Sequence, residues 1–252
     1  PVEDPVLWNG RKNPYLYTVR CEIFDSTTQE VTDNIDIRTG LREYHIDSHK
    51  GFFLNGEHIK LQGVSRHQDR ENMGNAITEK QHAEDIKIIL DVGANSVRLA
   101  HYQQNSYFYD LCDESGLLVW AEVPVISRFS PKRNENAEQQ LVELIKQNYN
   151  HPSIFCWGIE NEITIAGSAS KKLITFLKHM HKVARHLDPT RYTTCAQLTT
   201  CPVNSPLNHI TDIIGYNHYY GWYVGPCDEI NNWLDEWHRE NPEGKLCLSE
   251  YG

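Results

Sequence analysis

The sequence lacks an excess of basic residues. Its 24 Lys and Arg stand against 34 Asp and Glu, which gives a formal net charge of -10 over 252 residues. Because nucleic acids and anionic membrane surfaces attract basic faces, we expect neither as a partner. The sequence also lacks any apolar run of the roughly 20 residues that a membrane-spanning helix needs. It opens at Pro1 without a methionine or a signal peptide, so we expect it to be a piece of a longer protein.

No two cysteines have the CxxC spacing of a zinc ribbon or a redox site, and their count of seven is odd. Four of them lie in apolar patterns and are predicted to be buried free thiols: Cys112, Cys156, Cys195 and Cys247. Free thiols favour the cytoplasm, with the periplasm left open as an alternative. The histidines within 179–186 match no metal-ligand spacing. We therefore expect no metal and no cofactor.

The first part of the chain, residues 1–45, is predicted to be β-structure. Two extended runs, 14–25 and 30–47, alternate apolar and polar residues. Two or three strands rarely form a stable domain alone. We interpret residues 1–45 as the incomplete end of a β-sandwich and residues 46–252 as a second domain.

The second part repeats a unit of a short apolar strand, a polar loop and an amphipathic helix. Thr78 and Gln81 form a capping box at the start of its first helix, and Gly93 is a stop signal. The predicted strands are 58–65, 95–102, 117–124, 153–162, 191–198, 211–223 and 245–252. The predicted helices are 78–93, 105–116, 136–149, 170–188 and 229–241. Alternating strands and helices indicate a parallel sheet.

Two parallel-sheet architectures compete for this pattern. A doubly wound nucleotide-binding sheet needs a Gly-rich phosphate loop, and the sequence contains neither GxGxxG nor GxxxxGK[ST]. A (β/α)8 TIM barrel instead gathers its chemistry at the carboxyl ends of the strands. Polar residues crowd those ends here, so we predict the barrel. It is truncated after the seventh strand in this chain.

Two carboxylates at strand ends carry the predicted chemistry. Glu162 ends the fourth barrel strand and Glu250 ends the seventh, so both can reach one substrate bond across the barrel mouth. Hydrolysis of a glycosidic bond needs one acid to protonate the leaving oxygen and one carboxylate to attack or to direct water. Glu160 is a rival for the acid. It lies two residues deeper in the strand, which favours a structural hydrogen bond.

Five motifs in order resemble glycoside hydrolase family 2, which includes β-galactosidases and β-glucuronidases. They are "GVSRHQDR", "NSVRLAHY", "IFCWGIENE", "GYNHYYGWY" and "LSEYG". In addition, "PVLWNGRKNPYLYTV" resembles the end of the immunoglobulin-like domain that precedes the barrel in that family. The resemblance covers essentially the whole chain.

The resemblance implies a role for each matching residue. It implies that Glu162 is the general acid/base and that Glu250 is the nucleophile. Arg98 would keep the nucleophile ionised, and Asn161 would bind the sugar 2-hydroxyl. The remaining matches are substrate-contacting residues: His67, His101, Tyr219 and Tyr223. Alternatively, His67 and His101 are hydrogen-bonded histidines of the core, and Arg98 belongs to a buried ion pair.

Some residues depart from the family pattern. Ser65 stands where the family often has Asn. The stretch after the third strand offers Ile126 and Arg128 in place of the acid and the His that bind Mg²⁺ in large bacterial β-galactosidases, so we expect that metal site to be absent. The Asn-x-Lys signature with which β-glucuronidases recognise the glucuronide carboxylate would follow residue 252.

The sequence therefore predicts a retaining exo-β-glycosidase that hydrolyses terminal β-galactosides. A β-glucuronidase with the same mechanism is the first alternative, and an inactive carbohydrate-binding fragment is the second. The expected partner is a carbohydrate substrate. Whether the full-length protein forms a homo-oligomer is left open by the sequence.

Overall fold

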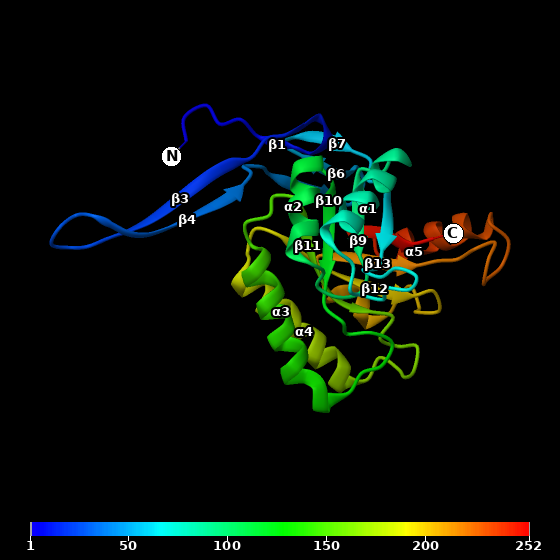
Figure 1. Ribbon diagram of the computed structural model, residues 1–252. Coiled ribbons are helices and arrows are strands. Elements are labelled where there is room, and N and C mark those ends of the chain that lie inside the picture. The colour runs from blue at the N-terminus through cyan, green and yellow to red at the C-terminus, as the bar shows by residue number, and fades with distance from the viewer. Residues whose placement is uncertain (1, 252) are drawn as a thin grey trace.

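Seven parallel strands form the central sheet of the computed structural model, which describes residues 2–251 (Figure 1). They are β8 (Gly63–Arg66), β9 (Ser96–Leu99), β10 (Leu118–Glu122), β11 (Ile154–Asn161), β12 (Tyr192–Leu198), β13 (Ile213–Asn217) and β14 (Leu246–Glu250). Each strand pairs with its neighbour in the sequence, so that β8 and β14 form the two edges. This is the nearly closed wall of a TIM barrel, as the strand–helix alternation predicted.

Helices connect most of these strands. They are α1 (Glu79–Asp91), α2 (Ser106–Ser115), α3 (Asn134–Asn148), α4 (Lys171–Leu187) and α5 (Glu229–Glu240). The predicted capping box is confirmed, because Gln81 Oε1 accepts the backbone N–H of Thr78 at 3.0 Å. A short 3-10 helix, η3 (Pro206–His209), follows β12 where the sequence showed little helical pattern. A second one, η2 (Pro131–Arg133), precedes α3.

Two apolar clusters hold the barrel together. The larger one lies between the strands and the helices and includes Trp157, Leu141 and Leu177. Every residue of β9, β10 and β11 is buried, which explains why these strands read as continuous apolar runs. The smaller cluster fills the inside of the barrel around Trp120 and Phe155.

Short antiparallel strands cover the amino end of the barrel. β5 (Tyr44–Asp47), β6 (Gly51–Leu54) and β7 (Glu57–Ile59) form one sheet, and β1 (Trp8–Asn9) pairs with β2 (Asn13–Pro14) next to the 3-10 helix η1 (Gly10–Lys12). Their large side chains join the cluster inside the barrel: Trp8, Phe52 and Leu54. This packing closes the end of the barrel opposite the predicted site.

A long hairpin of β3 (Tyr17–Phe24) and β4 (Val31–Thr39) projects from the body (Figure 1). Val19 pairs with Ile37 and Cys21 with Ile35, so one face of the hairpin is apolar. Ile35 is 58% exposed. The hairpin therefore takes little part in the barrel core.

Two predicted runs divide in the structure, and a third ends well before its predicted boundary. The run 58–65 splits into β7 and β8, because the Asn95 side chain bonds the backbone between them: its Nδ2 donates to Lys60 O and its Oδ1 accepts from Gln62 N, both at 2.8 Å. The run 30–47 splits into β4 and β5 at residues 40–43. The run 211–223 ends as a strand at Asn217, and the aromatic residues after it form a loop.

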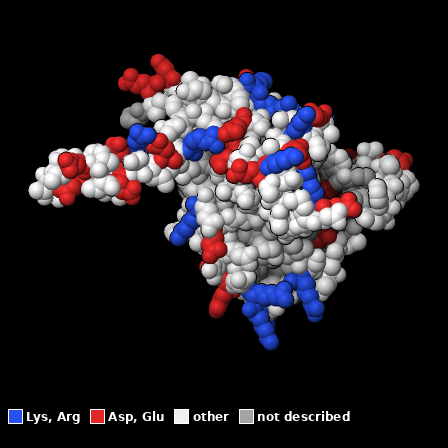
Figure 2. All heavy atoms as spheres, in the orientation of Figure 1, with Lys and Arg blue, Asp and Glu red and all other residues white. Residues whose placement is uncertain are grey.

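All seven cysteines are free thiols. Cys112, Cys156 and Cys195 are buried as predicted, whereas Cys247 is half-buried because it lies on the edge strand β14. Cys201, which the sequence did not single out, is buried as well. None of the helices described is both long and apolar enough to cross a bilayer. Acidic and basic side chains are interspersed on the face drawn in Figure 2.

Candidate active site

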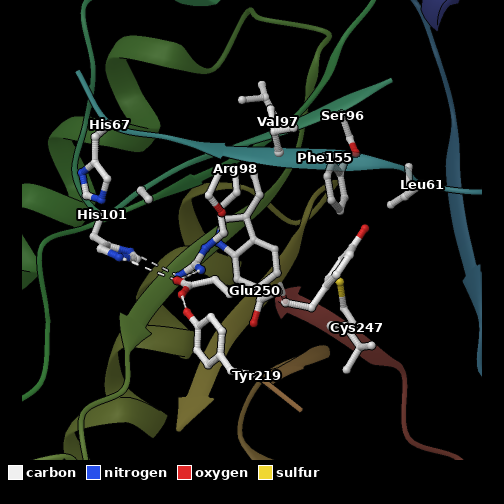
Figure 3. A pocket seen from close by; sticks show the side chains of 18 residues that line it. Leu61, His67, Ser96, Val97, Arg98, His101, Phe155, Tyr219, Cys247 and Glu250 are labelled. Carbon is white, nitrogen blue, oxygen red and sulfur yellow. Dashed lines mark hydrogen bonds and ion pairs between the residues drawn. The ribbon is translucent and has the colours of Figure 1, made fainter. Parts of the chain in front are cut away.

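Arg98, on β9, lies at the centre of the site and binds side chains from three other strands (Figure 3). Its guanidinium is 5% exposed and donates from Nη1 to Glu250 Oε1 at 2.5 Å. Nε donates to Glu122 Oε2 at 3.0 Å, and Nη2 donates to Asn161 Oδ1 at 2.7 Å. Burial lowers the pKa of Arg98, but the two carboxylates outweigh that effect and raise it. One buried cation is therefore held between two carboxylates.

The second carboxylate, Glu122, is the last residue of β10 and has no role predicted from the sequence. It is 1% exposed and also bonds His101, with Nδ1 of the imidazole 2.5 Å from Oε1. This contact leaves Nε2 of His101 facing Glu250, 3.7 Å from Oε1. Glu122 thus orients both Arg98 and His101. Only its place at the end of β10 could have indicated this from the sequence.

We expect Arg98→Met to destabilise the full-length protein, because the substitution leaves two carboxylates in the barrel without their cation. Breaking a buried pair by removing one partner costs about 3–5 kcal/mol. The free energy of unfolding, measured by urea denaturation, checks the loss.

Arg20→Met is the matched control for that measurement. Arg20 also contacts a carboxylate, Asp36, but the pair lies on the exposed hairpin, so we expect no measurable change. Equal stabilities of the Arg98→Met variant and the wild type would contradict the buried network.

Glu250 has a second donor from the loop after β13. The hydroxyl of Tyr219 donates to Glu250 Oε2, and the pKa of Tyr219 is raised, first by burial and then by the neighbouring carboxylate. Arg98 and Tyr219 therefore bind one oxygen each of Glu250.

Glu162 follows β11 directly and adopts a left-handed conformation with φ 47°. Its backbone N–H donates to Ala196 O at 2.7 Å. Burial raises the pKa of Glu162 and the charge of Glu250 adds to the increase, while a hydrogen bond from Asn217 opposes it. The two carboxylates that the sequence paired therefore interact, and their environments differ.

A cavity of about 480 Å³ opens between the edge strands β8 and β14 (Figure 3). Its polar end is lined by His67, Arg98, His101, Tyr219 and Glu250, and its apolar end by Trp120 and Phe155. The His67 and His101 rings lie 5.3 Å apart in an edge-to-face arrangement. Glu162 and Asn161 do not line this cavity, although Asn161 is bound to Arg98.

Tyr223 lies at the periphery of these groups and is mostly exposed. Its side chain is 73% exposed, and its ring contacts Tyr219 at 5.2 Å and Trp222 at 5.9 Å between centroids. The loop after β13 leaves the strand at Asn217, which carries Tyr223 outward.

A model of the glycosyl hydrolases family 2 TIM barrel domain matches residues 46–252. The chain belongs to this family.

Relatives cover the whole of this family 2 chain. A β-glucuronidase of Bacteroides fragilis is 40% identical over all of the chain, and a β-galactosidase of Thermoanaerobacter pseudethanolicus is 34% identical over 76% of it. The crystal structure of an FMN-binding β-glucuronidase from F. prausnitzii L2-6 superposes with a TM-score of 0.95 at 46% identity, over 100% of this chain and 39% of that one. The chain spans 36% of the first relative and 25% of the second.

After β10, Ile126 and Arg128 stand where large bacterial β-galactosidases have the acid and the His that bind Mg²⁺. Elsewhere in residues 2–251, one set of three side chains lies close enough to share a cation: Asp110, Asp113 and His151. Asp113 already accepts hydrogen bonds from His151 and from the Ser153 backbone, at the amino end of β11. These contacts orient Asp113 and His151.

Proposed function

We propose that the full-length protein is a retaining exo-β-glycosidase in which Glu250 is the nucleophile and Glu162 the general acid/base. The contrast between these two carboxylates carries the proposal. Arg98 and Tyr219 bind and orient the two oxygens of Glu250, whereas burial raises the pKa of Glu162 and favours its protonated form. A double displacement at a glycosidic bond requires one carboxylate oriented for attack and one carboxyl group that can donate a proton.

The reaction begins when a Glu250 oxygen attacks the anomeric carbon. Glu162 gives its proton to the glycosidic oxygen, so the C–O bond breaks and the aglycone leaves as an alcohol. Water then attacks the same carbon while the Glu162 carboxylate takes its proton, and the bond to Glu250 breaks. Two inversions release the sugar with its original β configuration.

Asn161, His101 and His67 are proposed to contact the sugar. Asn161 is held by Arg98, and Asn217 Nδ2 also donates to its Oδ1 at 3.2 Å. Because Oδ1 is occupied by two donors, the Asn161 amide group is oriented and its NH₂ can donate to a sugar hydroxyl. Tyr223 is proposed to contact the part of the substrate that extends out of the cavity.

For the sugar, we propose a β-glucuronide first and a β-galactoside second. The sequence alone favoured the galactoside. However, several relatives that match the entire chain are named β-glucuronidase, whereas two β-galactosidases at 34% and 35% identity match 76% of it. The galactoside stays the second candidate because a solved structure titled putative β-galactosidase of Bacteroides fragilis is 41% identical over 99% of the chain.

Assays with 4-nitrophenyl β-glucuronide and 4-nitrophenyl β-galactoside test both parts of the proposal. We expect the full-length protein to turn over the glucuronide faster, with a product that first appears as the β anomer by NMR. A higher kcat/KM for the galactoside would reverse the order of the two sugars, and no activity on either would contradict the enzyme assignment. The 252-residue chain alone should have little activity, because its cavity opens between two unpaired strand edges.

A further inference from the structure

Glu160 is a buried carboxyl group outside the proposed reaction. It lies on β11 with no exposed surface, and its Oε2 accepts the backbone N–H of Ile163 at 3.1 Å. Its Oε1 is buried without a hydrogen-bond partner. A buried carboxyl group is costly to keep, so its contact with the backbone needs a reason.

The backbone that Glu160 holds is the turn that carries Glu162. Glu162 has φ 47°, a region that residues other than glycine rarely adopt. Its own N–H is bound by Ala196 O at 2.7 Å, and the next N–H, that of Ile163, is bound by Glu160. The left-handed residue is thus fixed on both sides, once by the neighbouring strand and once by the Glu160 side chain.

We propose that Glu160 is a positioning residue that sets the backbone conformation of Glu162, and thereby the direction in which the proton-donating carboxyl group of Glu162 points. It acts through the backbone and touches neither substrate nor reacting atoms. The inference rests on the proposed function, because it assigns Glu160 to the residue that protonates the leaving group.

The carboxyl group suits this task in its uncharged form. Burial raises the pKa of Glu160 to about 8, and Glu122 adds to the increase while Arg98 opposes it. The ionisable groups that face Glu160 from β12 and from the loop after it are the thiols of Cys195 and Cys201, whose own pKa values burial raises. A neutral carboxyl accepts the Ile163 N–H through its carbonyl oxygen, as the amide of a glutamine would.

The test compares Glu160→Gln and Glu160→Met in the full-length protein on aryl glycosides with different leaving groups. Glutamine keeps the acceptor, whereas methionine fills a similar volume without one. A phenol leaves poorly and needs the acid, while 2,4-dinitrophenolate leaves without a proton. We expect Glu160→Met to lower kcat/KM for the phenyl β-glycoside by about 10- to 100-fold, a part of the 10²–10⁴ that an acid contributes.

Glu160→Met should lower kcat/KM for the dinitrophenyl β-glycoside less than about threefold, because this leaving group does not need the acid. Glu160→Gln should stay within about threefold of wild type on both substrates, because glutamine keeps the hydrogen-bond acceptor. Both substrates carry the sugar that the full-length protein prefers. Equal losses on the two leaving groups would mean that Glu160 only stabilises the fold. A Glu160→Gln variant as impaired as Glu160→Met would also overturn the inference.

Asp188→Asn is the matched control. Asp188 is a second fully buried carboxylate, which bonds Trp157 Nε1 at 3.0 Å and Arg191 at 2.7 Å at the far end of β12. Its substitution should lower the unfolding midpoint without any dependence of kcat/KM on the leaving group. If Glu162→Ala shows the leaving-group dependence and Glu160→Met does not, the inference about Glu160 fails while the proposed function stands. If Glu162→Ala shows none, the proposed function fails with it.

Discussion

Glu250→Gln is expected to abolish turnover by the full-length protein, with a loss in kcat on the order of 10⁴-fold or more, as for other residues that form the covalent bond. The side chain keeps its size, and the amide oxygen can still accept from Arg98 or Tyr219. However, an amide oxygen is a poor nucleophile, and no negative charge remains to stabilise the oxocarbenium-like transition state. The initial rate with a 4-nitrophenyl glycoside measures the loss.

The covalent step gives this prediction a second and more specific measurement. A 2-deoxy-2-fluoro glycoside with a good leaving group should trap the glycosyl-enzyme, and peptide mass spectrometry should find the label on Glu250. The matched control is Glu243→Gln, an exposed glutamate in the loop before β14, which should leave kcat unchanged. A label on Glu162 or on Glu122 would overturn the assignment, and so would an active Glu250→Gln variant.

The order of strands and helices could be predicted from the sequence, because short, mostly apolar strand segments alternate with helices that have one apolar face. The start of the first helix could be predicted from Thr78 and Gln81, since a capping box is a local signal. The strand boundaries at 58–65 could not. They depend on the side chain of Asn95, more than 30 residues away in the sequence, which takes the backbone hydrogen bonds that a continuous strand would have used.

For the candidate site, the sequence indicates which residues to consider but not how they contact one another. Glu162, Glu250 and Arg98 stand at strand ends, which is where a barrel gathers its chemistry. That Glu122 bonds both Arg98 and His101 depends on side-chain directions on β10, on β9 and in the segment after β9, and no local pattern carries that information. The outward position of Tyr223 has the same cause, because a loop after a strand has no fixed direction.

The second large effect is expected at Glu162. Glu162→Gln removes the proton donor, and we expect kcat/KM for a phenyl glycoside to fall by about 10²–10⁴-fold. The wild type should be active while Glu162 is protonated and lose activity as the pH rises through the Glu162 pKa. Because burial and the charge of Glu250 raise this pKa, the alkaline limb should lie above the ordinary range of a glutamate. The pH dependence of kcat/KM measures the limb, which should be absent from the Glu162→Gln variant.

The same residue must act as a base in the second half of the reaction, so its pKa should fall once Glu250 is glycosylated. Burial is the larger cause of the increase and persists in the intermediate, whereas the contribution of the Glu250 charge disappears. We therefore expect a partial decrease, which ¹³C NMR titration of the Glu162 carboxyl can follow in the free and the fluoroglycosyl enzyme. An unchanged pKa would mean that the two carboxylates are not coupled. The same alkaline limb in Glu162→Gln and wild type would assign the proton donor to another residue.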